Sequence, residues 1–236
     1  MPRQITEGES FGSSVHNTLK KWGDLEMGNQ ESIAKGQLEM FRDTKDEGSN
    51  KLTEELLIKL WHSSFIIEGY ESRLEVEFNR KRGEELMHKF FEWWQQVPRK
   101  ALVIEKGFKI DLNDLILTGR FDRIEEADDG IHVIDYKTSK PRSQAEVDAD
   151  LQLSIYALAS EKQFDQPCAK LTLLYLSEDE FVERTTERTK GQLKDAAKQI
   201  HSIFDQIEQK EFHPTPSKDI CRCCPYRGVC DASAVN

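Results

Sequence analysis

Two short segments of this 236-residue chain bring together side chains that could do chemistry. Gly119-Arg120-Phe121-Asp122-Arg123 supplies one acid, and Asp135-Tyr136-Lys137-Thr138 follows with a second acid and a lysine. Carboxylate oxygens are the ligands that hard divalent cations prefer. An ammonium group can offset negative charge on a phosphate. The combination is typical of a metal-dependent phosphodiesterase and points to a nuclease.

The residues around both acids predict neighbouring strands joined by a short hairpin. Lys137 lies two residues after Asp135, so both side chains share one face of the strand. A carboxylate near a sheet core is costly unless it is paired or metallated. For Asp122 alone, a salt bridge with Arg120 or Arg123 is an equal alternative. The spacing of the two acids with Lys137 favours a metal site.

In this interpretation Asp122, Asp135 and the backbone carbonyl of Tyr136 bind the cation. Mg²⁺ or Mn²⁺ there would polarise the phosphoryl group and lower the pKa of a bound water. Lys137 would hold the attacking water or offset charge on the phosphate in the transition state.

Other side chains are weaker candidates for the same site. His16, near the start of the first predicted helix, is a candidate third protein ligand, and an imidazole shifts preference from Mg²⁺ toward Mn²⁺. Its alternative is ordinary packing or exposure to solvent. Gln152 and Tyr156 share a helix face and could touch the phosphate or the attacking water, or be an ordinary polar and aromatic pair. Glu105 either extends the acidic site or faces solvent.

A cysteine-rich segment lies near the C-terminus. Cys221, Cys224 and Cys230 form a C-x₂-C-x₅-C pattern that suits an iron–sulfur or zinc site. Three thiolates do not complete a tetrahedron, and Cys223 is poorly placed beside Cys224 to supply the fourth. An unliganded tail is the alternative.

The periodicity predicts helices, then a strand meander, then a helix, two strands and a last helix. This order favours a mixed α/β core flanked by helices. We expect turns at 106–107, 113–114 and 128–130, and a helix stop at Pro98. The expected helices cover 10–35, 52–65, a segment after Tyr70 that runs to 96, 144–160 and 190–209; the expected strands cover 101–105, 108–110, 115–124, 131–137, 171–176 and 181–184.

Composition limits the partners. The net charge of −10 excludes a global positive field, so contact with DNA must come from local basic patches, bound metal or a partner. No apolar run is long enough to span a membrane, and the first residues lack the apolar core of a secretion signal. We therefore expect a cytoplasmic protein with no membrane partner.

The motifs taken together resemble the RecB-like branch of the PD-(D/E)XK nuclease superfamily, and most closely the C-terminal nuclease domains of UvrD-type helicases and AddAB-type helicase–nucleases. The segment 11–17 looks like the family's histidine motif, and 119–123 like its first acidic motif. Asp135-Tyr136-Lys137-Thr138 looks like its D-x-K motif, and 151–156 like its Q-x-x-x-Y motif. Cys221, Cys224 and Cys230 look like the last three ligands of its [4Fe–4S] cluster.

The resemblance implies a restriction-endonuclease-like sheet and metal-dependent hydrolysis of DNA by an exo- or endonuclease. Single-stranded DNA is the expected substrate. It also implies repair or recombination work with a helicase motor, in cis or in trans. The expected division is a nuclease domain over 1–211, with a helical part at about 10–97 and a catalytic core at about 101–211, followed by a cysteine tail over 212–236.

One departure from the family concerns the first cluster cysteine, which normally precedes the histidine motif. No cysteine precedes His16 here. We expect a domain cut from a longer polypeptide; an incomplete cluster or another fourth ligand are the alternatives. A CRISPR-adaptation nuclease shares the same motifs, and some relatives that have lost the acids serve as DNA-binding scaffolds.

Overall fold

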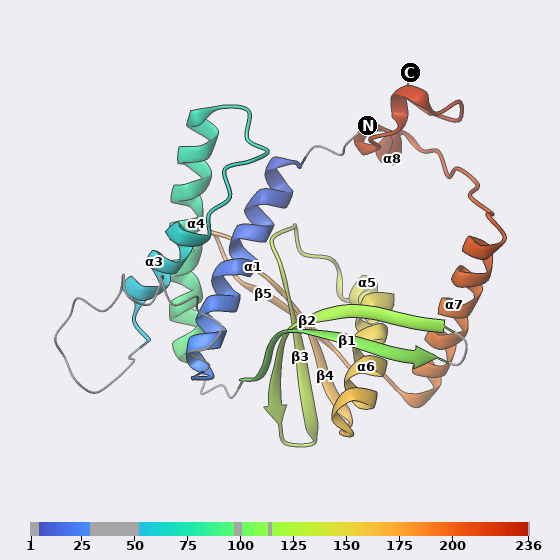
Figure 1. The fold of residues 1–236 in the computed structure, drawn as a ribbon, viewed down its shortest axis with the longest axis horizontal. Coiled ribbons are helices and arrows are strands. Elements are labelled where there is room, and N and C mark those ends of the chain that lie inside the picture. The colour runs from blue at the N-terminus through green and yellow to red at the C-terminus, as the bar shows by residue number, and fades with distance from the viewer. Residues whose placement is uncertain (1–4, 29–51, 97–100, 113–114, 236) are drawn as a thin grey trace. The chain divides into compact units, whose positions relative to one another are not determined.

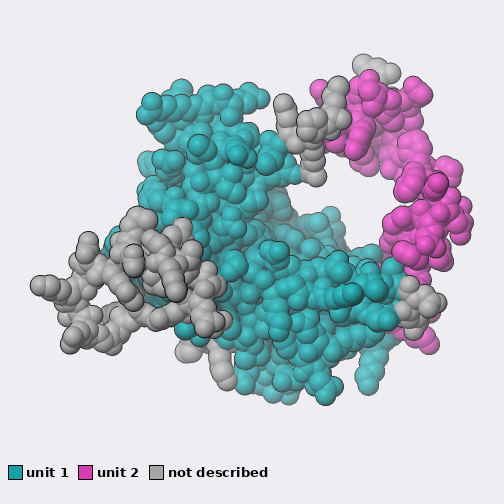
Figure 2. Space-filling view, viewed as in Figure 1, with its two compact units in different colours: residues 1–193 teal, residues 194–236 magenta. Residues whose placement is uncertain are grey.

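The computed structural model describes residues 5–28, 52–96, 101–112 and 115–235. The chain divides into two compact units, residues 1–193 and 194–236 (Figure 2). The first contains the sheet and all the predicted catalytic residues. The second contains Cys221, Cys223, Cys224 and Cys230. Within the described residues, no helix combines the length and apolar character needed to cross a membrane.

A mixed sheet forms the centre of the first unit, with the strand order β1-β2-β3-β4-β5 (Figure 1). β1, β2 and β3 are antiparallel neighbours, β3 and β4 are parallel, and β5 is antiparallel to β4. The predicted α/β class with a mixed sheet and flanking helices is confirmed. The strands are β1 (Ala101–Leu112), β2 (Leu115–Ala127), β3 (Gly130–Lys137), β4 (Cys168–Tyr175) and β5 (Val182–Thr186).

Two groups of helices accompany the sheet. One group, α1, α3 and α4, packs together around a core that includes Trp22 and Trp61. The other group, α5 and α6, forms the crossover between β3 and β4, because parallel strands cannot be joined by a tight hairpin. The helices are α1 (Glu7–Glu26), α3 (Glu54–Ser64), α4 (Arg73–Gln96), α5 (Gln144–Asp148), α6 (Leu151–Phe164), α7 (Lys190–Glu208), α8 (Lys218–Cys223) and a 3₁₀ turn (Arg227–Val229).

Capping side chains account for where the helices begin. α1 begins at Glu7 rather than Ser10, because Thr6 and Glu9 form a capping box. The helix expected over 10–35 therefore starts earlier than expected, and its last residue in the structure is Glu26. Residues 29–35 of the expected first helix, the stop at Pro98 and the turn at 113–114 lie outside the described residues.

Two sequence expectations about the core elements are wrong. The helix expected over 144–160 is two helices, because Asp150 accepts the N–H of Leu153 and so starts α6. The strands expected over 101–105 and 108–110 are one strand, β1, with no turn at 106–107. Gly107 pairs with Arg120 there, and the ladder continues through it.

Gly83 of α4 lets a tryptophan approach the helix backbone. A Cβ at this position would lie 1.8 Å from Cζ2 of Trp61, whose Nε1 donates to the carbonyl of Arg80 at 2.9 Å. Trp61 is fully buried. The absence of a side chain at Gly83 is therefore a requirement of the packing between α3 and α4.

We expect Gly83→Ala to lower the free energy of unfolding by about 1–3 kcal/mol, because the added methyl group overpacks the Trp61 contact. Gly8→Ala, in α1, is the matched control, since nothing lies within 4 Å of its added Cβ. Urea denaturation of both variants gives the comparison. A Gly83→Ala protein as stable as the Gly8→Ala protein would contradict the packing.

Candidate active site

The candidate site forms where β2 and β3 separate. Their ladder runs from Ala127 and Gly130 to a last pair of Arg123 with Ile134. Just beyond that pair, the N–H of Tyr136 donates to Oδ2 of Asp122 at 2.8 Å. A buried backbone N–H needs an acceptor. The Asp122 carboxylate supplies it and is thereby fixed at the opening between the strands.

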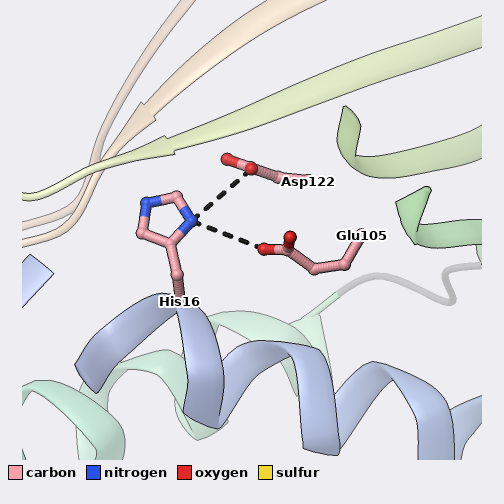
Figure 3. A group of neighbouring side chains, drawn as sticks. All are labelled: His16, Glu105 and Asp122. Carbon is pink, nitrogen blue, oxygen red and sulfur yellow. Dashed lines mark ion pairs between the residues drawn. The ribbon is translucent and has the colours of Figure 1, made fainter. Parts of the chain in front are cut away.

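Three potential metal ligands meet at this opening (Figure 3). Nδ1 of His16, on α1, lies 3.5 Å from Oδ1 of Asp122 and 3.6 Å from Oε1 of Glu105. One ligand atom from each residue lies within 4.8 Å of the other two. The β1–β2 register explains the acid pair, since the pairs on either side place Glu105 opposite Asp122. Glu105 therefore extends the acidic site, which is the first of the two alternatives above.

The backbone of Glu105 is strained. Its φ of 45° lies in the left-handed region, where a residue with a side chain is uncommon. Such a conformation costs on the order of 1–3 kcal/mol and persists where the surroundings enforce it, often at functional sites. Here it occurs at the residue that faces both His16 and Asp122.

The His16 imidazole carries a proton between the two acids. Burial disfavours its charged form, but hydrogen bonds and charges from Asp122 and Glu105 outweigh burial and raise its pKa to about 10. The two carboxylates thus attract a cation strongly enough to hold an imidazolium. One imidazole nitrogen with two carboxylates is also a donor set suited to Mn²⁺ or Mg²⁺.

A second group of predicted residues forms a closed ring of polar contacts. Lys137 Nζ donates to Oε1 of Gln152 at 3.0 Å, and Gln152 Nε2 donates to the Tyr156 hydroxyl at 3.0 Å. Tyr156 donates to Oδ1 of Asp135 at 3.0 Å. Lys137 Nζ closes the ring 2.6 Å from Oδ2 of Asp135, as an ion pair whose angles do not make a hydrogen bond.

The negative charges of the two groups influence each other. Burial raises the pKa of Asp135, and the charge of Asp122 raises it further, while Lys137 and Tyr156 oppose the rise. Burial, followed by the charges of Asp135 and Asp122, also raises the pKa of Tyr156. Tyr156 therefore stays a neutral hydroxyl that donates to Asp135 at any ordinary pH.

The predicted site residues thus lie in two adjoining groups. His16 and Asp122 belong to the three-ligand group, and Asp135 to the ring with Lys137. Metal binding by Asp135 and by the carbonyl of Tyr136 stays a prediction. The alternative in which Arg120 or Arg123 pairs with Asp122 is wrong: Arg120 lies 3.4 Å from Glu105, and Arg123 pairs with two other acids.

Those two acids, Glu26 and Glu125, make a buried clamp around Arg123 that the sequence did not reveal. Both terminal nitrogens of Arg123 donate to Glu26 at 2.7 and 2.8 Å, and Nε donates to Glu125 at 2.6 Å. Because Glu26 ends α1 and Arg123 follows Asp122 on β2, the clamp fixes α1, with His16, against the sheet. No local pattern pairs residues so far apart in sequence.

The cysteines of the second unit are free thiols of differing exposure. Cys221 is buried and accepts the N–H of Ala234 at 3.4 Å, while Cys224 and Cys230 are half-buried. Across the described residues, His16, Glu105 and Asp122 are the metal-ligating group that forms, and it contains no thiol. The predicted [4Fe–4S] cluster therefore gains no support here and stays a prediction.

Comparison with known families decides the class of protein. Residues 2–231 match the family described as the PD-(D/E)XK nuclease superfamily. This chain belongs to that superfamily. Its mixed sheet with flanking helices is consistent with the restriction-endonuclease-like fold predicted above. Members of the superfamily are typically metal-dependent nucleases, which agrees with the ligand group at the ladder opening.

Two phage proteins are similar in sequence. The Gene 69 protein of Mycobacterium phage D29 is 24% identical, over 68% of this chain and 62% of the phage protein. The Gene 69 protein of Mycobacterium phage L5 is 23% identical, over 93% of this chain and 83% of the phage protein. The chain thus spans less than two thirds of the D29 protein. The crystal structure of SSO0001 aligns over 92% of this chain and 95% of its own, with 15% identity and a TM-score of 0.41.

Metal binding at the three-ligand group has a direct test. We expect Mn²⁺ to raise the melting temperature of the wild-type protein, because a ligand that binds only the folded state stabilises it. Asp122→Asn removes a charged ligand and should abolish most of that rise. Asp129→Asn, in the exposed β2–β3 turn, is the matched control. An equal rise in both variants would place the metal elsewhere.

The buried clamp predicts a large stability effect. Arg123→Ala removes the arginine that pairs with Glu26 and Glu125 in the interior and should cost about 3–5 kcal/mol in unfolding free energy. Arg73→Ala removes an exposed arginine from a surface pair with Glu77 and should change little. Urea denaturation measures both. If the two variants unfold alike, the clamp does not hold α1 to the sheet.

Proposed function

We propose that this chain hydrolyses phosphodiester bonds of single-stranded DNA as a divalent-metal-dependent nuclease. The observation that carries the proposal is the meeting of His16, Glu105 and Asp122 beside the ring that contains Asp135 and Lys137. Carboxylates and an imidazole that can hold a divalent cation, with an ammonium group beside them, suit the negative charge of a phosphate. Membership of the superfamily supports the same reaction.

His16, Glu105 and Asp122 would hold Mg²⁺ or Mn²⁺, with Asp135 and the Tyr136 carbonyl as the further ligands that the motifs predict. When bound, the cation would supply charge stabilisation to the phosphate and acidify water. It would also take over the neutralisation of the two acids that the His16 imidazolium provides in its absence.

Lys137 is the proposed catalytic cation of the chain itself. Its ammonium group contacts both Asp135 and Gln152. The Lys137 side chain is nevertheless 26% exposed to solvent. It can therefore donate to the attacking water or to a phosphate oxygen without leaving its place. Gln152 and Tyr156 act as positioning residues, since their hydrogen bonds fix Lys137 and Asp135 relative to one another.

Two finer proposals concern the partners. The RecB-like order of the motifs favours a role beside a helicase motor in repair or recombination. The net charge of −10 supports a motor that holds the strand while this domain cuts it, because the chain has no global field to attract DNA. No base-reading element is expected, so contacts to the sugar-phosphate backbone are the default.

End-labelled single-stranded DNA tests the proposal. The wild-type chain should cut it with Mn²⁺ or Mg²⁺ and not with EDTA. Asp135→Ala should lower the rate at least a hundredfold and Lys137→Gln by a similar factor, because a single charge-stabilising group contributes about 10²–10³ in rate. Lys170→Gln, an exposed lysine at the opposite end of the β3–β4 ladder, should keep the wild-type rate.

Full activity in Asp135→Ala would rule out its proposed role. Absence of cutting by a folded wild-type chain that binds Mn²⁺ would contradict a self-sufficient nuclease and favour a requirement for the partner. Absence of both cutting and metal binding would favour the non-catalytic scaffold.

A further inference from the structure

One half of the β1–β2 hairpin extends beyond the candidate site with one face uncovered. β2 pairs with β3 only up to Arg123, whereas β1 and β2 pair along their full length. Phe108, Ile110 and Leu112 are buried, and the Phe108 ring contacts Tyr156 of α6. The positions between them, 107, 109 and 111, are exposed. Within the described residues, the hairpin therefore has one packed face and one bare face.

The bare face is continuous with the metal-ligand group. Residues opposite each other in a ladder point to the same face, and each second residue along a strand repeats that face about 7 Å further on. From Glu105 and Asp122 the next pair on this face is Gly107 with Arg120, followed by Lys109 with Thr118. Two cations thus lie one and two steps from the acids.

Arg120 already borders the site. It lines a hollow of about 430 Å³ together with His16, Glu105 and Asp122. Its side chain is 66% exposed, and its single contact to Glu105 is long, at 3.4 Å. Exposed ion pairs of this kind contribute little stability. The guanidinium is therefore available to a phosphate, which it can bind through two parallel hydrogen bonds.

A second hollow continues the path at the free edge of β1. It has a volume of about 400 Å³ and is lined by Gly107, Lys109 and Asp111 of β1 with Lys162 of α6. Lys162 also donates to the carbonyl of Asp111. Gly107 borders this hollow and pairs with Arg120 at the first.

We propose that Arg120, Lys109 and Lys162 bind successive phosphates of the DNA strand that enters or leaves the candidate active site. The inference rests on the proposed nuclease function and identifies the strand path for it. In a chain with a net charge of −10, Arg120 and Lys109 on the bare face, together with Lys162 of α6 beside the β1 edge, form the local basic patch that DNA contact requires. The strand is single in this inference, as in the proposed function on which it rests.

Binding of a fluorescein-labelled 20-mer oligothymidylate, followed by anisotropy in Mn²⁺ at several salt concentrations, tests the path. Asp135→Asn serves as the parent, so that the strand is not cut during the measurement. Changing Arg120, Lys109 and Lys162 to glutamine in that parent should weaken binding at least tenfold. It should also flatten the log–log salt dependence by about 2, since each phosphate contact on a single strand contributes about 0.7.

The matched control removes three exposed cations elsewhere, Arg73, Lys81 and Lys198, also as glutamines. It carries the same net charge and should bind within twofold of the parent. Equal affinity and equal salt slope in the two triple variants would overturn the path. A loss confined to duplex DNA of the same length would overturn the assignment to a single strand.

A cutting assay on the wild-type chain, with Asp135 intact, separates this inference from the nuclease proposal. If the chain cuts DNA but the triple variant binds normally, the path is wrong and the nuclease proposal stands. If the chain does not cut but the triple variant loses binding, the path stands and the nuclease proposal fails. If the parent binds no DNA, the path is overturned.

Discussion

Buried negative charge at the opening of the β2–β3 ladder is the constraint on which the first unit depends. Asp122 and Asp135 are both largely removed from water, with Glu105 beside them. Such a group is stable only where cations or hydrogen bonds compensate it. His16 compensates from α1, Lys137 from β3, and the N–H of Tyr136 from the separating strand. Each compensating group is also one that a bound metal or a phosphate would engage, so the features that stabilise the fold here are those that the proposed chemistry uses.

A separate ion pair, outside the acidic group, attaches α1 to the sheet. Arg123, next to Asp122 on β2, joins the strand to the last residue of α1 through Glu26. His16 is thereby held over the acids, and its ring also contacts the Tyr136 ring edge-on. On the crossover side, Gln152 and Tyr156 of α6 do the same for Lys137 and Asp135. The site is thus fixed from two elements that belong to opposite ends of the unit's sequence.

Local signals predicted the parts that depend on local order. The alternation along β3 placed Asp135 and Lys137 together, and the four-residue spacing on α6 placed Gln152 with Tyr156. What could not be predicted depends on pairing across the sheet. The place of Glu105 follows from the β1–β2 register, and Gly107 reads as a turn although it is a strand residue opposite Arg120. The role of Glu26 could not be predicted, because its partner Arg123 lies on β2, far away in the sequence. Asp150 could have been recognised as a helix start, which would have divided the helix expected over 144–160 correctly.

We expect His16, Glu105 and Asp122 to bind one divalent cation together. Pulsed electron paramagnetic resonance of the protein with one equivalent of Mn²⁺ tests it most directly, because a directly bound imidazole nitrogen couples to the electron spin. We expect one ¹⁴N coupling in the wild-type protein and its loss in His16→Gln, with Mn²⁺ still bound more weakly by the carboxylates. Tight Mn²⁺ binding with no nitrogen coupling, or a coupling that survives in His16→Gln, would contradict it.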